Sequence, residues 1–162
     1  VAIRGDGAGG EDQRAVCRRD PQRQWMRAMH QNAVGGQGRD AGAVDAMKNA
    51  NAPYSKFPVG AAAFSGDGRL VSGCNVENAI YGLTLCAECA LVGNLQMTGG
   101  GLLRAFYCVD SAGNVLMPCG RCRQLLYEFR APGMELMTTQ GIKTMDQVLP
   151  DAFGPQNLED PR

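Results

Sequence analysis

The 162-residue chain has one histidine, no net charge and no long apolar run. Its 16 basic and 16 acidic residues balance, so the composition lacks the basic character of nucleic-acid-binding proteins. No apolar stretch approaches the roughly 18 residues that a membrane-spanning helix needs. The N-terminal stretch also lacks the apolar core of a signal peptide. We therefore expect neither a nucleic-acid partner nor a membrane segment, and we expect a cytoplasmic protein.

The composition divides the chain into two parts. Residues 1–39 are rich in glycine, arginine, glutamine and aspartate and show no sustained period, which predicts a disordered N-terminal extension. Residues 40–162 are long enough to bury one core and too short for two ordinary domains. We expect a single domain there.

Strand-like and helix-like segments alternate along this domain. A helix is expected from residue 41, a hairpin of VGAAAFS and RLVSGCNV around the turn GDG, and a helix over residues 83–97. RAFYCVD predicts a third strand, CGRCRQLLYEFR a helix after Pro118, and MELMTT a fourth strand. This order predicts an α/β fold in which helices cover both faces of a mixed sheet, a three-layer α-β-α sandwich.

Four of the seven cysteines form two CxxC pairs, Cys86 with Cys89 and Cys119 with Cys122. Two such pairs are a strong metal signal, and one interpretation is a structural zinc module with four cysteine ligands. However, the pairs are further apart than the roughly 15 to 20 residues usual for such modules. Both pairs also lie at the start of a predicted helix and not in a tight turn.

The second interpretation is a catalytic zinc site with three cysteine ligands. Helix N-termini favour thiolates, which applies to Cys86, Cys119 and Cys122. Three thiolates leave one zinc position open for a water molecule, whose pKa zinc can lower to about 7. Glu88 can then face this water as a base, and Cys89 remains a neutral thiol beside the site. Spacing alone leaves both interpretations open.

The motif CAE followed by PCxxCRQ resembles the zinc nucleoside and nucleobase deaminases. A cysteine in CAE, where relatives have a histidine, is similar to the small homotetrameric cytidine deaminases. The segments NAPYSKFPVGAA, GCNVENAIYG and LPDAFGP resemble the same subfamily. The resemblance covers about residues 41–158.

This resemblance implies a hydrolase of pyrimidine salvage that deaminates cytidine and 2′-deoxycytidine to uridine and 2′-deoxyuridine and releases ammonia. One zinc ion per subunit would be bound by Cys86, Cys119 and Cys122. Zinc-bound hydroxide would attack C4 while Glu88 shuttles protons. The resemblance also implies which residues bind the substrate. The base would be contacted by Phe57, the Ala87 N–H and the Met117 carbonyl, and the ribose by Asn75 and Glu77. Ala79, Tyr81 and Phe153 would complete the pocket of a neighbouring subunit.

Position 89 departs from the subfamily pattern. Many members read CAER, and that arginine donates hydrogen bonds to the ligand thiolates, whereas this chain has Cys89. Three thiolates and one divalent cation carry a net negative charge, which weakens zinc as a Lewis acid unless it is compensated. We expect Arg121 to provide the compensation, and the alternative is an Arg121 that only faces solvent. The alternatives to cytidine deamination are the structural four-cysteine module and a deaminase of another aminopyrimidine nucleoside, for example one of the blasticidin type.

Overall fold

The computed structural model describes Gln24, in a helical conformation, and residues 41–158. The prediction of a disordered extension over residues 1–39 therefore lies, Gln24 apart, outside the described residues. None of the helices in the described part has the length and apolar character needed to cross a bilayer. In chain order the elements are α3 (Ala41–Met47), β1 (Gly60–Ser65), β2 (Leu70–Cys74), the 3-10 helix η1 (Tyr81–Leu83), α4 (Ala87–Met97), β3 (Leu103–Val109), α5 (Gly120–Glu128), β4 (Arg130–Thr138), β5 (Gly141–Thr144), α6 (Met145–Val148) and the 3-10 helix η2 (Pro155–Asn157).

The strands form one mixed sheet in the order β2-β1-β3-β4-β5. β3 and β4 are parallel, and the other neighbouring strands are antiparallel. The predicted hairpin, third strand and fourth strand are all present. β5 and α6 were not predicted, because elements of four residues are too short to show a period.

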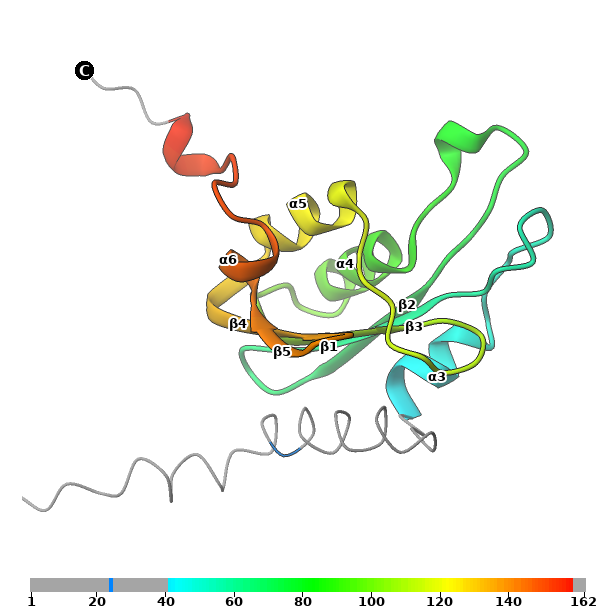
Figure 1. Cartoon of the computed structure of the whole chain (residues 1–162), viewed down its shortest axis with the longest axis horizontal. Coiled ribbons are helices and arrows are strands. Elements are labelled where there is room, and N and C mark those ends of the chain that lie inside the picture. The colour runs from blue at the N-terminus through cyan, green and yellow to red at the C-terminus, as the bar shows by residue number, and fades with distance from the viewer. Residues whose placement is uncertain (1–23, 25–40, 159–162) are drawn as a thin grey trace, which may run out of the picture.

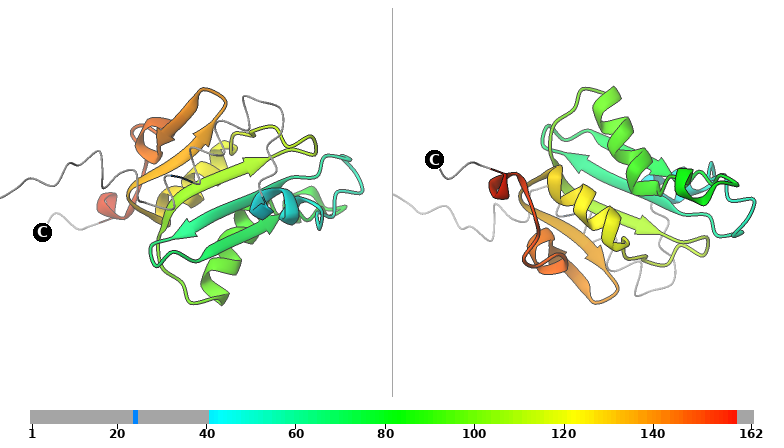
Figure 2. Two further views of the ribbon diagram at one scale, coloured as in Figure 1. Left: turned by 90° about the horizontal axis from the view of Figure 1, so that it is seen from below. Right: turned by 90° about the horizontal axis from the view of Figure 1, so that it is seen from above.

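Helices cover both faces of this sheet, as the three-layer prediction requires. Figures 1 and 2 show α3 on one face and α4, α5 and α6 on the other. The side chains of β1 and β3 alternate between two buried clusters accordingly. The cluster under α4 and α5 includes Ala61, Ala63, Leu91, Leu95, Phe106 and Leu126, and the cluster under α3 includes Ala43, Ala62, Ala105, Tyr107 and Val109.

The helix expected over residues 83–97 begins later, at Ala87. Leu85 is held in an extended conformation because it forms an isolated antiparallel bridge with Val76. The Val76 and Leu85 main chains exchange two hydrogen bonds of 2.9 Å. The helix can therefore start only after this bridge, and Cys86 becomes its N-cap residue. This correction matters because it places Cys86 at the point where strand-like chain becomes helix.

Candidate active site

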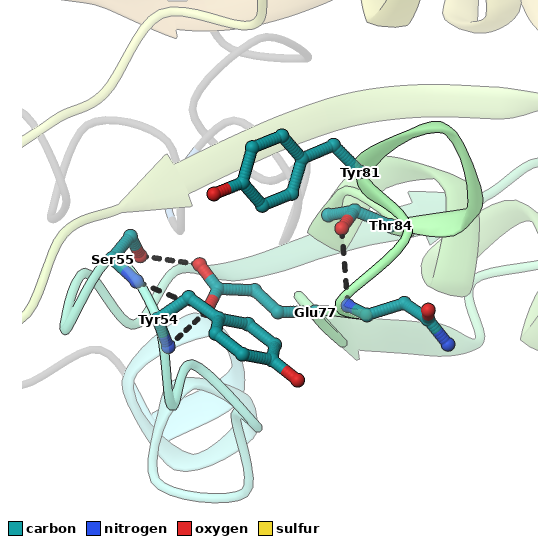
Figure 3. Close-up of a pocket in the computed structure, with 6 residues that line it drawn as sticks. Tyr54, Ser55, Glu77, Tyr81 and Thr84 are labelled. Carbon is teal, nitrogen blue, oxygen red and sulfur yellow. Dashed lines mark hydrogen bonds between the residues drawn. The ribbon is translucent and has the colours of Figure 1, made fainter.

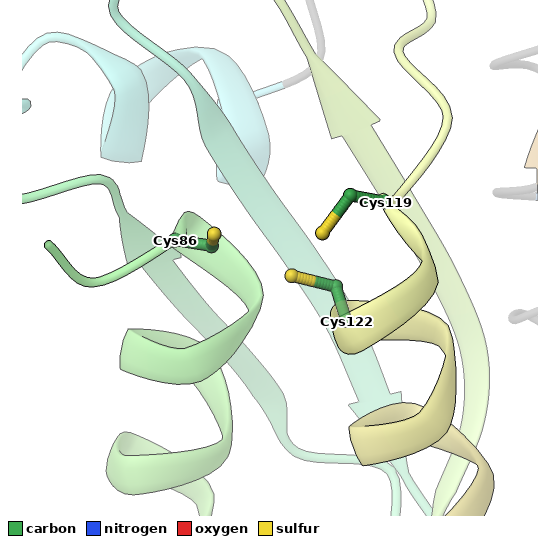
Figure 4. Close-up of side chains that lie close together, drawn as sticks. All are labelled: Cys86, Cys119 and Cys122. Carbon is green, nitrogen blue, oxygen red and sulfur yellow. The ribbon is translucent and has the colours of Figure 1, made fainter. Parts of the chain in front are cut away.

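Three cysteines converge between the N-termini of α4 and α5. The sulfur atoms of Cys86, Cys119 and Cys122 all lie within 4.8 Å of one another (Figure 4). Cys86 is the N-cap of α4, Cys119 is the N-cap of α5, and Cys122 lies in the first turn of α5. Sulfurs bound to one tetrahedral zinc ion at about 2.3 Å would lie about 3.8 Å apart. The donor set and its spacing therefore fit zinc.

The three thiols have different electrostatic environments. A hydrogen bond from the Cys122 backbone N–H lowers the pKa of the exposed Cys119 thiol. Burial raises the pKa of Cys86 and also that of Cys122. Without a cation, burial thus favours the neutral form of two of the three thiols. A divalent cation at their centre is the partner that would stabilise three thiolates here.

Cys89 does not belong to this group of sulfurs, although it is in the same helical turn as Cys86. It lies at the third position of α4, and its backbone N–H donates to the Cys86 carbonyl oxygen at 3.0 Å. Cys122 has the same position relative to Cys119 in α5 and does join the group, so the spacing within the helix does not decide which cysteines belong to it. The geometry favours three ligands and not the four-cysteine module.

Glu88 is a buried acid beside these thiols, with 5% of its surface exposed. After burial itself, the Glu88 charge is a cause of the raised pKa of both Cys86 and Cys122. No described residue donates a hydrogen bond to its carboxylate. A buried carboxylate that is free of protein partners and lies next to a metal-binding group is a candidate general acid and base.

Two main-chain groups near the same site have no hydrogen-bond partner among the residues that the structure describes. Ala87 is fully buried at the first position of α4, where a helix N–H has no partner within the helix. Among the described residues, none donates to the carbonyl oxygen of Met117. The neighbouring Pro118 carbonyl accepts from Arg123 Nε at 2.8 Å, and a second Arg123 nitrogen donates to the Val148 carbonyl at 3.2 Å. Arg123 therefore holds the loop that leads into Cys119, a role that the sequence analysis did not assign.

A pocket of about 380 Å³ is lined by Tyr54, Ser55, Glu77, Asn78, Tyr81 and Thr84 (Figure 3). The Glu77 carboxylate accepts the backbone N–H groups of Tyr54 at 2.9 Å and Ser55 at 3.2 Å. It also accepts a short hydrogen bond from the Ser55 hydroxyl. These bonds, that of the hydroxyl first, lower the pKa of Glu77. The pocket therefore presents an ionised carboxylate at neutral pH.

The Val76–Leu85 bridge joins this pocket to the thiols. Glu77 follows Val76 directly and Cys86 follows Leu85 directly. In an antiparallel pairing the neighbours of bridged residues also face each other, so Asn75 lies opposite Cys86 and Glu77 lies opposite Thr84. The bridge therefore joins the segment that carries Glu77 to the segment that carries Cys86, with the two residues on opposite sides of it.

Asn75, which is predicted to bind the ribose, also contacts the protein's own main chain. It is buried, and its side-chain amide bonds the main chain of the segment before β1, at Phe57 and Val59. Phe57 itself is 46% exposed. The sequence did not indicate this contact, because the two segments are far apart along the chain.

The residues predicted to serve a neighbouring subunit are exposed. Ala79 and Tyr81 lie on the loop between β2 and α4, and Tyr81 is 81% exposed. Phe153 is 59% exposed near the C-terminus, and Gln124 Nε2 donates to its carbonyl oxygen at 2.8 Å. Within one subunit these side chains are not part of the thiol cluster. Gln124 is a further positioning residue that the CRQ motif contained but the sequence analysis did not interpret.

Arg121 is exposed in the first turn of α5, and its guanidinium forms no hydrogen bond or ion pair with a described residue. Its neighbour Arg123 is already bound to two carbonyl groups. Of these two arginines, Arg121 is thus the one whose charge is not committed to the fold.

Comparison with known proteins gives a consistent result. Residues 41–138 match the family model described as the cytidine and deoxycytidylate deaminase zinc-binding region. A cytidine deaminase of Mycobacterium tuberculosis is 56% identical over 118 residues, which cover 72% of this chain and 87% of the relative. One of Sporosarcina psychrophila is 37% identical over 119 residues, covering 70% and 87%. The crystal structure of the Mycobacterium leprae cytidine deaminase matches with a TM-score of 0.66 and 60% identity, covering 67% of this chain and 92% of that one.

Proposed function

The chain belongs to the cytidine deaminase family of zinc-dependent hydrolases, which deaminate cytidine hydrolytically, and for that reaction we propose a role for each residue of the site. The observation that carries the proposal is the convergence of three thiols beside the buried Glu88. It supports a metal site with an open position and an adjacent acid. Neither feature would be needed in a purely structural zinc module.

Cys86, Cys119 and Cys122 would bind one zinc ion per subunit, since their sulfurs are grouped for it. Zinc bound there would supply an activated water as the nucleophile at neutral pH. The helix N-termini that carry the three cysteines would stabilise their thiolate forms. Arg121 would offset the remaining negative charge.

Glu88 would move the protons of the reaction. It would accept a proton from the attacking water and deliver it to N3 of the pyrimidine while the oxygen bonds to C4. It would then take the remaining proton of the new hydroxyl group on C4 and pass it to the C4 amino group, so that the C4 carbonyl forms, the C–N bond breaks and ammonia leaves. The burial of Glu88 supports this role, and so does the absence of a hydrogen-bond donor to its carboxylate among the described residues, because the carboxylate can then face substrate.

The base would be held by main-chain groups and one aromatic ring. The Ala87 N–H would donate to the base carbonyl, and the Met117 carbonyl would accept from the amino group. Phe57 would pack against the pyrimidine ring. The uncommitted Ala87 N–H at the start of α4 supports the first of these contacts.

The sugar would occupy the pocket around Glu77, whose ionised carboxylate would accept hydrogen bonds from its hydroxyl groups. Such a contact favours nucleosides over free bases, because a free base has no sugar hydroxyl group to donate to Glu77. Cytidine and 2′-deoxycytidine both meet this requirement, which suits an enzyme of pyrimidine salvage. The balanced charge of the chain also supports a small-molecule substrate and no nucleic-acid partner.

A substrate panel tests this assignment. The zinc-loaded protein should deaminate cytidine and 2′-deoxycytidine and leave free cytosine nearly untouched, as measured by ultraviolet absorbance and ammonia release. Preferential turnover of a blasticidin-type nucleoside would replace the salvage role with that of another aminopyrimidine deaminase. If the zinc-loaded protein turns over no aminopyrimidine nucleoside, the result would instead support the interpretation as a structural zinc module.

The loop between β2 and α4 supports a homotetramer with shared active sites. It exposes Ile80, Tyr81, Leu83 and Leu85 by 65%, 81%, 60% and 45%. An apolar patch of this kind is typical of a subunit interface. Tyr81, Ala79 and Phe153 would complete the pocket of a neighbouring subunit.

Subunit mixing tests the shared site. The Glu88→Gln variant lacks the proton shuttle in its own site. The Phe153→Ala variant would lack only the side chain that completes the pocket of a neighbouring subunit. Hybrid tetramers of the two variants should regain activity, because some sites then combine Glu88 with an intact Phe153. Absence of recovery in hybrids verified by mass would assign Phe153 to its own subunit or remove it from the site.

The cysteine thiols also relate to the cellular compartment in which the protein would function. The six cysteines of the described residues are unpaired. Metal-binding thiols remain available in a reducing environment, which supports a cytoplasmic location. Cell fractionation of the tagged protein tests it.

A further inference from the structure

We infer that Ser55 is a positioning residue, whose hydroxyl group holds the Glu77 carboxylate in the orientation in which it accepts from a sugar hydroxyl. Ser55 is not among the residues that the resemblance implies in substrate binding. The inference rests on the proposed role of Glu77 and deepens it, because it identifies what fixes the direction of that contact.

Three hydrogen bonds from the loop before β1 hold the Glu77 carboxylate (Figure 3). Its Oε2 accepts from the backbone N–H groups of Tyr54 at 2.9 Å and of Ser55 at 3.2 Å. Its Oε1 accepts a short hydrogen bond from the Ser55 hydroxyl. Both carboxylate oxygens are thus engaged, so the plane of the carboxylate cannot turn unless one of these bonds breaks.

These bonds leave acceptor capacity on one oxygen of Glu77. An ionised carboxylate offers about four acceptor sites, two on each oxygen. The two backbone N–H groups occupy the sites of Oε2, and the Ser55 hydroxyl occupies one site of Oε1. The site that the described residues leave open therefore belongs to Oε1. Ser55 and Glu77 line the same pocket, so a sugar hydroxyl bound there would share Oε1 with Ser55.

A second partner determines the direction of the Ser55 hydroxyl. The Phe57 N–H donates to Ser55 Oγ at 3.0 Å, and this contact uses the oxygen as an acceptor. A serine that accepts from the N–H two residues later is a common local motif in turns. The single hydroxyl hydrogen then remains for Glu77, whose ionised carboxylate can only accept.

The same hydrogen bond supports the charge of Glu77. The Ser55 hydroxyl is the largest cause of the lowered pKa of Glu77, and burial acts in the opposite direction. The backbone N–H groups of Tyr54 and Ser55 and the charge of Lys56 lower this pKa further. A side chain without a hydroxyl at position 55 would keep the backbone donors but would lose the contact to Oε1.

The first test compares Ser55→Ala with Ser55→Thr by steady-state turnover of cytidine. Ser55→Ala should lower kcat/KM about 10-fold, the order expected for a hydrogen bond to a charged group. The loss should appear mainly as a higher KM, because a sugar contact is made in the ground state as well as in the transition state. Ser55→Thr keeps the hydroxyl and should recover most of the loss. A loss confined to kcat, or an equal loss in both variants, would contradict the inference.

A double-mutant cycle tests whether Ser55 acts through the carboxylate. In a Glu77→Ala background, Ser55→Ala should change kcat/KM by less than about 2-fold, because the hydroxyl has already lost its acceptor. An undiminished penalty would overturn the inference, in favour of a direct contact of Ser55 with substrate or of a role limited to the loop. If Glu77→Ala does not fold, Glu77→Gln takes its place, since a neutral amide also removes the charged contact. Thermal midpoints measured alongside show that the compared proteins are folded.

Ser111→Ala is the matched control, because it makes the same substitution at an exposed position in the turn after β3. It should leave kcat and KM unchanged. Failure of the proposed function would look different from failure of this inference. In the first case the unaltered protein would not deaminate cytidine, whereas in the second the unaltered protein is active and only the pattern among the variants differs.

Discussion

Gly73 of β2 lies directly against the backbone of Leu91 in α4. A Cβ atom added at Gly73 would lie 2.3 Å from the Leu91 nitrogen and 2.6 Å from the Ala87 carbonyl oxygen. No side chain can fit there unless the helix or the strand moves. The position of α4, whose first turn carries Cys86 and Glu88, thus depends on the absence of a side chain in β2.

Gly73→Ala should therefore destabilise the fold and weaken zinc binding together. Overpacking of this kind costs about 1 to 3 kcal/mol or more in free energy of unfolding. Denaturant unfolding and zinc titration measure the two effects. The control is Gly93→Ala, because Gly93 is exposed within the same helix and an added Cβ there meets nothing within 4 Å. Gly93→Ala should stabilise the helix by up to about 1 kcal/mol, and equal effects of the two variants would contradict the close-packing argument.

Glu88→Gln should abolish most turnover and leave the zinc content unchanged. General acid–base catalysis contributes about 10²-fold to 10⁴-fold, and glutamine cannot carry protons while it keeps the shape of the side chain. Cytidine turnover and metal content by elemental analysis are the measurements. Glu128→Gln makes the same substitution at an exposed position of α5 and should be fully active. Substantial activity in Glu88→Gln would show that another group moves the proton.

Cys89→Ala should still bind one zinc ion per subunit, whereas Cys86→Ala should lose most of its affinity. The reason is that the group of sulfurs within 4.8 Å contains Cys86 and excludes Cys89. Competition with a chromogenic chelator measures both affinities. Equal loss of zinc in the two variants would indicate a fourth cysteine ligand and a closed site.

Arg121→Ala should lower zinc affinity or turnover at least about tenfold, since charges around a metal site commonly have effects of about 10-fold to 100-fold. Arg121 is the arginine of the α5 N-terminus that is not bound to carbonyl groups of the fold. The matched control is Arg104→Ala, at an exposed position of β3. If zinc affinity and turnover are unchanged in Arg121→Ala, Arg121 does not compensate the charge of the three thiolates.

The turn between β1 and β2 should contribute stability that is lost in acid. Hydrogen bonds from the Ser65 hydroxyl and from Arg69 lower the pKa of Asp67 to about 2. A carboxylate with a lowered pKa stabilises the folded state at pH values above its unfolded pKa of about 4. This contribution disappears as the pH falls to about 2. Asp67→Asn should therefore have a lower thermal midpoint than the unaltered protein at neutral pH, and the difference should close between about pH 4 and 2.

A difference in thermal midpoint that stays constant over that pH range would show that the carboxylate charge plays no part. Asp45→Asn is the control. Among the described residues the Asp45 carboxylate pairs with Lys48 alone, both side chains are exposed, and such pairs contribute little. Its removal should change the midpoint little at any pH.

Much of the fold class was readable from the sequence because it depends on local periodicity. The alternation of strand and helix segments predicted the mixed sheet and its two covered faces. β5 and α6, and likewise the 3-10 helices η1 and η2, were missed because they are too short for a period to appear. Pro132 and Gly133 also obscured the start of β4, which begins at Arg130 and is displaced from its register with β3.

What the sequence by itself determined was the chemistry of the centre: cysteines at helix starts, and an acid two residues beyond the first of them. These are relations between neighbours along the chain, and helix geometry converts them directly into spatial ones. Three features were decided only by the tertiary structure. Cys89 lies outside the group of sulfurs, and α4 begins only after the Val76–Leu85 bridge. The Asn75 side chain is hydrogen-bonded to the Phe57 carbonyl. Those outcomes depend on contacts between distant segments, which arise when the core packs and which no local pattern encodes.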